Sequence, residues 1–490
     1  MAIKKLIFIF SLFFFQIFCQ PVKDQLRWTF ELINHGARSP HKGLDSNFKD
    51  FSNHTWIGQN ELTGVGLRQS FLIGYRDKLR YIEEKELISK EYDPREILVH
   101  ASENNRTLMS ANALLHGLYP PGTGPTIDPS LVDRAVPPVD SSTYIEEKNR
   151  LDNCNYTALP DRMNLIPVHI NFAHEFFTQY EASKKCEGLK SYEEKNKKRE
   201  EVVNFLKEMN QKYKNLEKIF PAQKNTLLEN YEFAYTFFDT MLCLYYDAAE
   251  EFDKILAILE MTGRQQEVIQ DCQDFLFLNT IGNGIDNDKE FINYLVSPLF
   301  RKLLILMDLV IKKDSNGEKD YRGYDLPKYY IISAVANTCG SFMAFMNKYF
   351  NTSINYVDFA TNIHIELYLE EKEGGIISES DYRIEYFFND DFLLSIPYVE
   401  FKNKIKNELY NKTAINEFCK KKDDKEEKKD DDDGTDWYLI GIFIGLGVIV
   451  VLVVIIVIVL RTRMKNNQEN REFDNNDNNP LVRDTRISGE

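Results

Sequence analysis

Short apolar runs alternate with helix-forming stretches in the first third of the chain and again near residue 330. The runs at 26–33, 96–99 and 329–335 are rich in aliphatic and aromatic residues, a composition typical of buried strands. Helix-forming stretches follow the first two runs, at 61–79 and 107–118. Strands that alternate with helices across long spacers predict an α/β fold built around a core sheet with flanking helices.

The middle of the chain has a different period. Within 194–220, apolar residues recur at steps of four and three, which places them on one face of a long helix. These residues are Val202, Leu206, Met209, Tyr213, Leu216 and Phe220. Similar patterns at 225–265 and 288–312 predict a mainly helical subdomain, residues 171–320, inserted between strands of the core. A coiled-coil dimer is the competing interpretation, but the pattern lasts too few heptads to favour it.

The first twenty residues have the pattern of a secretory signal peptide. Lys4 and Lys5 precede an apolar run at 6–18 that is too short to span a bilayer. Cleavage near Cys19 would remove one cysteine of the seven. A buried N-terminal strand or an anchor is the alternative interpretation of residues 1–20.

A second apolar segment, 437–460, contains no charged residue and is long enough to cross a bilayer as a helix. Arg461 and Arg463 follow it directly, whereas aspartates precede it, so the positive-inside rule places the tail 461–490 in the cytosol. The segment predicts a single-pass type I membrane protein of the plasma membrane or a lysosome-like compartment.

Between the two ends lies the predicted ectodomain, residues 21–419. The segment 420–436 is almost wholly charged, cannot bury apolar surface and is expected to form a solvated stalk. Glycosylation sequons begin at Asn53, Asn105, Asn155, Asn351 and Asn411, which agrees with a glycoprotein. We expect the Asn105 sequon to be buried and unmodified.

Composition narrows the classes of partner. The chain has 60 Lys+Arg against 76 Asp+Glu, a formal charge of −16, which argues against a nucleic-acid binder. Seven cysteines without a CxxC pair argue against a thiolate zinc site, and we expect neither a metal nor a cofactor.

Two polar strings follow the first two predicted strands. His35, Gly36 and Arg38 come directly after the run 26–33, the usual position for ligand-binding groups in open α/β sheets. Arg106 follows the run 96–99 and falls at a predicted helix N-terminus, which itself favours an anion. The arginine side chain offers a planar fork that matches phosphate or carboxylate, and a histidine can attack phosphorus or shuttle a proton. Two arginines and a histidine at consecutive strand ends therefore indicate an anion pocket.

Several ordered motifs resemble those of the histidine acid phosphatases of the prostatic and lysosomal type, a branch of the histidine phosphatase superfamily. The similarity covers roughly residues 26–419. It rests on NHGARSP (34–40), ELTGVGLRQ (61–69), NRTLMSA (105–111), GLYPP (117–121), IPVH (166–169) and IELY (365–368).

The resemblance implies the phosphoglycerate mutase-like fold and hydrolysis of a small phosphomonoester through a phosphohistidine. Carried over by motif, His35 is the nucleophile, and Arg38 and Arg106 hold the phosphoryl oxygens. The resemblance further implies a homodimer and a disulfide between Cys186 and Cys419.

The chain departs from the family pattern at two places. Asn34 stands where the signature has an arginine, which removes a charge-assisted fork worth about 1.5–3 kcal/mol. Val335 and Ala336 stand where the family has a second histidine and the acid that protonates the leaving alcohol. Loss of such an acid costs roughly 10²–10⁴ in rate when the leaving group needs a proton. Glu103 is a weak candidate for a substitute acid.

These departures favour an impaired or inactive family member, a pseudoenzyme that binds a phosphorylated ligand. A working acid phosphatase with a substitute proton donor is the first alternative. A structural or adhesive surface glycoprotein, in which the pocket has no role, is the second.

Overall fold

The computed structural model describes residues 24–41, 54–56, 58–170, 186–220, 227–281, 289–317, 326–370 and 377–420. Residues 1–422 form one compact unit by their contacts, and residues 423–490 are assigned to another. The predicted signal peptide, span and tail lie outside the described residues, as does the stalk apart from Lys420. Within the described part, no helix combines the length and the apolar character needed to cross a membrane.

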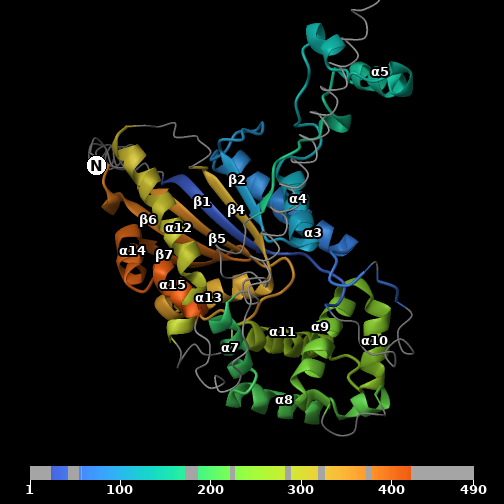
Figure 1. Ribbon diagram of the computed structural model, residues 1–490, viewed down its shortest axis with the longest axis vertical. Coiled ribbons are helices and arrows are strands. Elements are labelled where there is room, and N and C mark those ends of the chain that lie inside the picture. The colour runs from blue at the N-terminus through green and yellow to red at the C-terminus, as the bar shows by residue number, and fades with distance from the viewer. Residues whose placement is uncertain are drawn as a thin grey trace, which may run out of the picture. The chain divides into compact units, whose positions relative to one another are not determined.

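A seven-stranded mixed sheet organises the described residues, with strand order β3-β2-β4-β1-β5-β6-β7 (Figure 1). The first four strands in that order run parallel, and β5, β6 and β7 continue the sheet antiparallel. Their bounds are β1 (Gln25–Asn34), β2 (Ile97–Ala101), β3 (His169–Ile170), β4 (Tyr329–Ala334), β5 (Asn362–Leu369), β6 (Tyr382–Phe388) and β7 (Asp391–Pro397). The prediction of an α/β fold with a central sheet is confirmed.

Residues 28–34 of the central strand β1 are all buried, because both faces of the strand are covered. Trp28, Phe30 and Leu32 belong to a core cluster formed with the long helix α12 (Lys289–Ser315) and with α13 (Ala336–Phe350). Ile33 points to the opposite face and packs in a second cluster with residues of α4. A strand buried on both sides is expected to be largely apolar. The segment 26–33 follows this rule except at Arg27, Thr29 and Glu31.

Helices α3 (Gly64–Asp77) and α4 (Asn105–Leu118) follow β1 and β2, and the predicted stretches 61–79 and 107–118 are confirmed with shifted bounds. A π-helical segment, η1 (Lys78–Glu84), extends α3. Short elements then lead to β3: η2 (Pro129–Arg134), η3 (Ser141–Thr143), α5 (Ile145–Asn153) and η4 (Pro160–Arg162). After the sheet come α14 (Tyr398–Lys406) and α15 (Lys412–Lys420).

The described residues between β3 and β4 form helices and no strand. Besides α12 they are α7 (Glu187–Asn196), α8 (Glu200–Lys212), η5 (Lys214–Lys218), η6 (Leu227–Glu229), α9 (Tyr231–Asp247), α10 (Ala249–Ile258) and α11 (Gln265–Ile281). Phenylalanine side chains of α9 and α11 pack together in a core cluster separate from the two clusters of the sheet.

The single long helix predicted over 194–220 is wrong, although its apolar face is right. The chain takes an extended conformation at Arg199 before α8 and leaves the α-helix at Tyr213. Tyr213 is held there because its hydroxyl donates to the buried carboxylate of Asp271, 2.5 Å away. All six residues of the predicted face are buried, so the period identified the core side but not the breaks.

The disulfide implied by the family resemblance is present, with Cys186 and Cys419 bonded at 2.08 Å. It connects the residue before α7 to the last turn of α15. The four other described cysteines are unpaired; Cys154 is exposed, and Cys243, Cys272 and Cys339 are buried.

A buried ionic network lies under the C-terminal end of α3. The carboxyl groups of Glu31 on β1 and Asp77 on α3 are both fully buried, and Arg76 pairs with Asp77 at 2.8 Å. The hydroxyl of Tyr329 donates to Oε2 of Glu31. Oε1 of Glu31 and Oδ2 of Asp77 have no hydrogen-bond partner among the described residues. Burial, reinforced by Asp77, raises the pKa of Glu31, and burial raises the pKa of Asp77.

Candidate active site

The C-terminal ends of β1, β2 and β4 meet at one edge of the sheet. Asn34 pairs with Ala334 and Ala101 with Ser333, so the residues that follow these strands begin at the same level. His35 follows β1, Arg106 lies in the first turn of α4 after β2, and Val335 follows β4. The topology therefore brings the predicted site residues to the same edge.

Close backbone contact between α3 and the loop after β1 fixes the histidine-bearing segment. A Cβ atom on Gly36 would lie 2.2 Å from the carbonyl oxygen of Gly66, and one on Gly66 would lie 2.1 Å from that of Ala37. Gln69 accepts the backbone N–H of Ala37 at 2.8 Å, and Ser110 of α4 accepts that of Gly36 at 3.1 Å. Gly36, Gly66 and Gln69 of the motifs thus hold the loop that carries His35 against α3.

His35 is oriented as a neutral imidazole. Its Nδ1 lies 2.9 Å from the carbonyl oxygen of Gly36, which can only accept, so Nδ1 carries the proton. Nε2 therefore carries the lone pair. Burial, followed by the charges of Arg106 and Arg38, holds the pKa of His35 well below its usual value. The imidazole of His35 therefore stays neutral at a lower pH than that of an ordinary histidine.

Arg38 is clamped by a carboxylate from the helical region. Its Nη2 lies 2.7 Å and its Nη1 3.2 Å from the two carboxylate oxygens of Asp239 on α9, and Nη1 also donates to the Ser39 carbonyl. The guanidinium stacks 5.5 Å from the ring centre of Phe359. Burial opposes its charge, but Asp239 holds the pKa of Arg38 above the ordinary value. Nε of Arg38 has no hydrogen-bond partner among the described residues.

Arg106 supplies a second buried cation. It is 8% exposed, and its Nη1 donates to the side chain of Asn104 at 3.3 Å. Its Nε is also without a hydrogen-bond partner in the described part of the chain. Burial and the charge of Arg38 lower the pKa of Arg106 to about 10. Arg106 lies at the N-terminus of α4, where an anion is favoured, and it repels Arg38 in the loop after β1. Each of the two guanidiniums has a buried Nε without a hydrogen-bond partner among the described residues, so an anion between them would be stabilised.

The positions that depart from the family pattern hold no proton donor. Val335 is buried as the cap residue of α13, and Ala336 begins that helix. The Asn34 amide donates to the backbone carbonyl of Asp358 at 2.7 Å, so it is engaged outside the anion site. Glu103 is exposed.

The expected burial of the Asn105 sequon is wrong. Asn105 is exposed at the start of α4, and its amide donates to Glu61 at 3.2 Å. Arg106, one residue later, turns inward because successive helical residues point about 100° apart.

Asp239 is the site residue that the sequence reasoning missed. It lies in the apolar helix segment TFFDTML, where a lone acid is a signal of a buried partner. The signal does not name that partner, which stands about two hundred residues earlier in the chain.

Among the described residues, Glu31, Asp77 and His364 could each offer a metal ligand atom within 4.8 Å of one another. The group lies at the opposite end of α3 from the anion site, and Arg76 already places a cation 2.8 Å from Nε2 of His364. That contact makes His364 neutral and leaves the group as an ionic network of the core.

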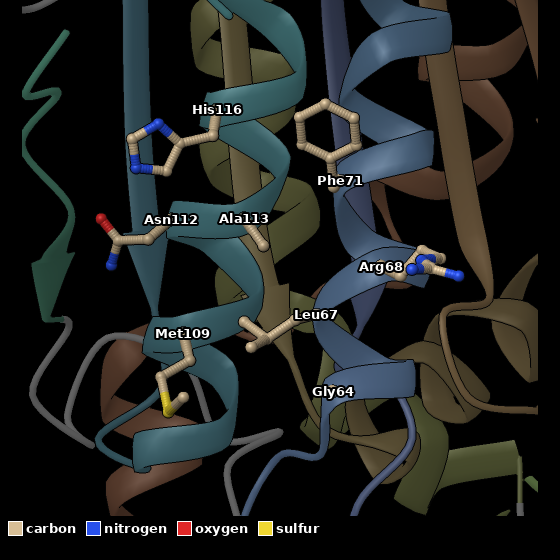
Figure 2. Close-up of a pocket in the computed structure, with 8 residues that line it drawn as sticks. All are labelled: Gly64, Leu67, Arg68, Phe71, Met109, Asn112, Ala113 and His116. Atoms are coloured by element: carbon tan, nitrogen blue, oxygen red, sulfur yellow. The ribbon is translucent and has the colours of Figure 1, made fainter. Parts of the chain in front are cut away.

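A shallow groove of about 510 Å³ lies between α3 and α4. Figure 2 shows Leu67 of α3 and Ala113 of α4 facing the space between the two helices. Its lining is mainly apolar and includes none of His35, Arg38 and Arg106, so we do not assign it to the anion site.

The family model described as histidine phosphatase superfamily, branch 2, matches residues 25–389. The chain therefore belongs to branch 2 of the histidine phosphatase superfamily. It is 34% identical over 114 residues to lysosomal acid phosphatase of Xenopus laevis, covering 23% of this chain and 25% of that protein. It is 26% identical over 133 residues to lysophosphatidic acid phosphatase type 6 of Mus musculus, covering 26% and 32%. The chain thus matches about a quarter to a third of these relatives' length.

Among solved structures, the phytase of Klebsiella sp ASR1 matches 80% of this chain and 98% of that one. The sequence identity is 11% and the TM-score 0.46. The multiple inositol polyphosphate phosphatase of Bifidobacterium longum, in complex with inositol hexasulfate, matches 77% and 88%, with a TM-score of 0.46 at 12% identity.

Proposed function

We propose that this chain binds phosphomonoesters at the His35 site and is impaired as a phosphatase because it lacks the acid that protonates the leaving alcohol. The observation that carries the proposal is the end of β4, where Val335 and Ala336 stand at the positions of the family's second histidine and acid. His35, Arg38 and Arg106 are buried at the anion site.

The proposed chemistry has two steps. Nε2 of His35 attacks phosphorus, the bond to the leaving oxygen breaks, and a phosphohistidine forms. Water then attacks phosphorus, His35 is regenerated and phosphate leaves. Arg38 and Arg106 stabilise the charge on the phosphoryl oxygens in both steps.

The leaving group decides how far the reaction proceeds. An alkoxide must be protonated as it leaves, and removal of a general acid costs about 10²–10⁴ in rate. A nitrophenolate leaves without being protonated, so hydrolysis of a nitrophenyl phosphate does not need the missing general acid. We therefore propose slow turnover of alkyl phosphates and measurable turnover of aryl phosphates with good leaving groups.

The proposed setting is the secretory pathway. The apolar segments at 1–20 and 437–460 support a type I membrane protein with the site outside the cytosol. One matched relative is named as lysosomal, which supports a lysosome-like compartment or the plasma membrane. The exposed sequon asparagines Asn105, Asn155, Asn351 and Asn411 are compatible with glycosylation, and a homodimer remains part of the proposal.

The proposal is tested by restoring the family's pair. Val335→His together with Ala336→Asp should raise kcat/KM for an alkyl phosphate such as glycerol phosphate by about 10²-fold or more, since a general acid supplies 10²–10⁴. The matched control is Val335→His with Ala336→Asn, which places a similar side chain without the proton. Equal rates for both variants and the original chain would contradict the proposal.

A further inference from the structure

The carboxylate of Asp239 faces the anion site, although it belongs to α9 in the helical region. Its side chain is 3% exposed, and its two oxygens accept from both terminal nitrogens of Arg38. Oδ2 also accepts the backbone N–H of His41 at 2.8 Å. Three donors therefore fix this carboxylate in one orientation.

This arrangement decides which edge of Arg38 can meet a ligand. The carboxylate of Asp239 accepts hydrogen bonds from Nη1 and Nη2, the two terminal nitrogens of the Arg38 guanidinium. The remaining buried donor, Nε, has no hydrogen-bond partner within the described residues, and Arg106 presents an Nε in the same condition. Asp239 thus occupies the two terminal nitrogens of Arg38 and leaves Nε as its buried donor without a hydrogen-bond partner among the described residues.

The same carboxylate reduces the positive charge of the site. Arg38 and Arg106 repel one another, and Asp239 stabilises both cations. A bound phosphate is repelled by Asp239 while it is attracted by the two guanidiniums. Because the interior screens charges poorly, the repulsion weakens anion binding substantially.

We propose that Asp239 is a positioning residue of the anion site, which aligns Arg38 for the phosphoryl group and limits the affinity for phosphate so that the product can leave. The inference rests on the proposed function and goes beyond it, because it assigns a helical-region residue to the control of binding. A phosphohistidine route ends with inorganic phosphate in this site, so affinity for that ion sets the rate of release.

The test uses the full chain and inorganic phosphate, with binding measured by isothermal titration calorimetry. Asp239→Asn keeps the size of the side chain and removes the charge, so we expect the Kd for phosphate to fall about tenfold. Asp239→Glu keeps the negative charge, so its Kd for phosphate should stay within about threefold of the value for the original chain. An unchanged or higher Kd in Asp239→Asn overturns the inference.

Kinetics with p-nitrophenyl phosphate give a second readout that a purely structural role would not produce. In Asp239→Asn, KM should fall together with Kd, while kcat falls because Arg38 is less fixed and phosphate leaves more slowly. A parallel loss of kcat with a raised KM would indicate general damage and overturn the inference.

Two further variants separate the possible failures. Asp271→Asn removes another buried acid of the helical region, one that binds Tyr213, and should leave the Kd for phosphate unchanged. Arg38→Ala should abolish phosphate binding if the proposed site exists. If the original chain binds no phosphate, the proposed function fails; if it binds and Asp239→Asn binds equally, the inference alone fails.

Discussion

At the scale of single residues, the site depends on backbone approaches that permit no side chain. The sequence predicted that His35, Arg38 and Arg106 meet, since spacing after parallel strands fixes which edge they reach. It could not predict Asp239, because contacts between segments two hundred residues apart depend on the packing of the helical region. Nor did it show that Asn105 is exposed, because helix phase at a terminus follows from the cap.

The contact at Gly66 gives a prediction at this scale. Gly66→Ala places a Cβ 2.1 Å from the Ala37 carbonyl oxygen, a backbone atom that cannot move aside. We expect the free energy of unfolding to fall by about 1–3 kcal/mol, as overpacking does, with weakened phosphate binding. Denaturant unfolding measures the loss. Gly64→Ala is the matched control, because a Cβ there meets no atom within 4 Å; equal stability of the two variants would refute the prediction.

At the scale of elements, periodicity located the buried faces better than the breaks. The face predicted over 194–220 is buried, but the helix is interrupted twice. Arg199 has an extended backbone conformation before α8, and Tyr213, where α8 ends, donates a hydrogen bond to Asp271. The antiparallel strands β5, β6 and β7 were not predicted as strands. The sequence of β5, NIHIELYL, does alternate polar and apolar residues, which is a strand signal that the sequence analysis did not use. The sequence of β7, DFLLSIP, lacks such an alternation.

The junction of β1 and α3 gives a pH prediction. Glu31 and Asp77 each present a buried oxygen without a hydrogen-bond partner among the described residues, and burial raises the pKa of both. A raised folded-state pKa means that the bound proton stabilises the fold. This stability is complete below the unfolded pKa of Glu31, about 4.5, and is lost as pH rises toward the folded value.

We therefore expect the unfolding free energy to decrease above pH 4.5, with a slope of up to about 1.4 kcal/mol per pH unit for one proton. Glu31→Gln imitates the protonated acid and should flatten this dependence, making the variant the more stable protein at pH 8. Urea unfolding at pH 5, 6.5 and 8 provides the comparison. Identical pH dependence in both proteins would show that the pair does not hold the proton.

At the scale of the whole molecule, sequence motifs identified the family, whereas the structure was needed to show how strands, helices and site residues are arranged. The disulfide between Cys186 and Cys419 was implied by the family resemblance and is present. The cysteine positions in the sequence did not by themselves indicate which cysteines pair. The apolar segments 1–20 and 437–460 carry the proposals about compartment and membrane from composition alone. The site edge, by contrast, follows from strand order, because a mixed sheet with adjacent parallel strands must gather their C-terminal ends.

The central claim is that the chain has a working nucleophile without a proton donor. It is tested most directly by hydrolysis of p-nitrophenyl phosphate and of glycerol phosphate between pH 4 and 7, by the full chain and its His35→Ala variant. We predict nitrophenyl turnover that disappears in His35→Ala, with glycerol phosphate at least about 10²-fold slower. If the full chain hydrolyses both esters at comparable rates and both activities disappear in His35→Ala, the chain has a proton donor and the claim is contradicted. If the full chain and His35→Ala hydrolyse p-nitrophenyl phosphate at equal rates, His35 is not the nucleophile.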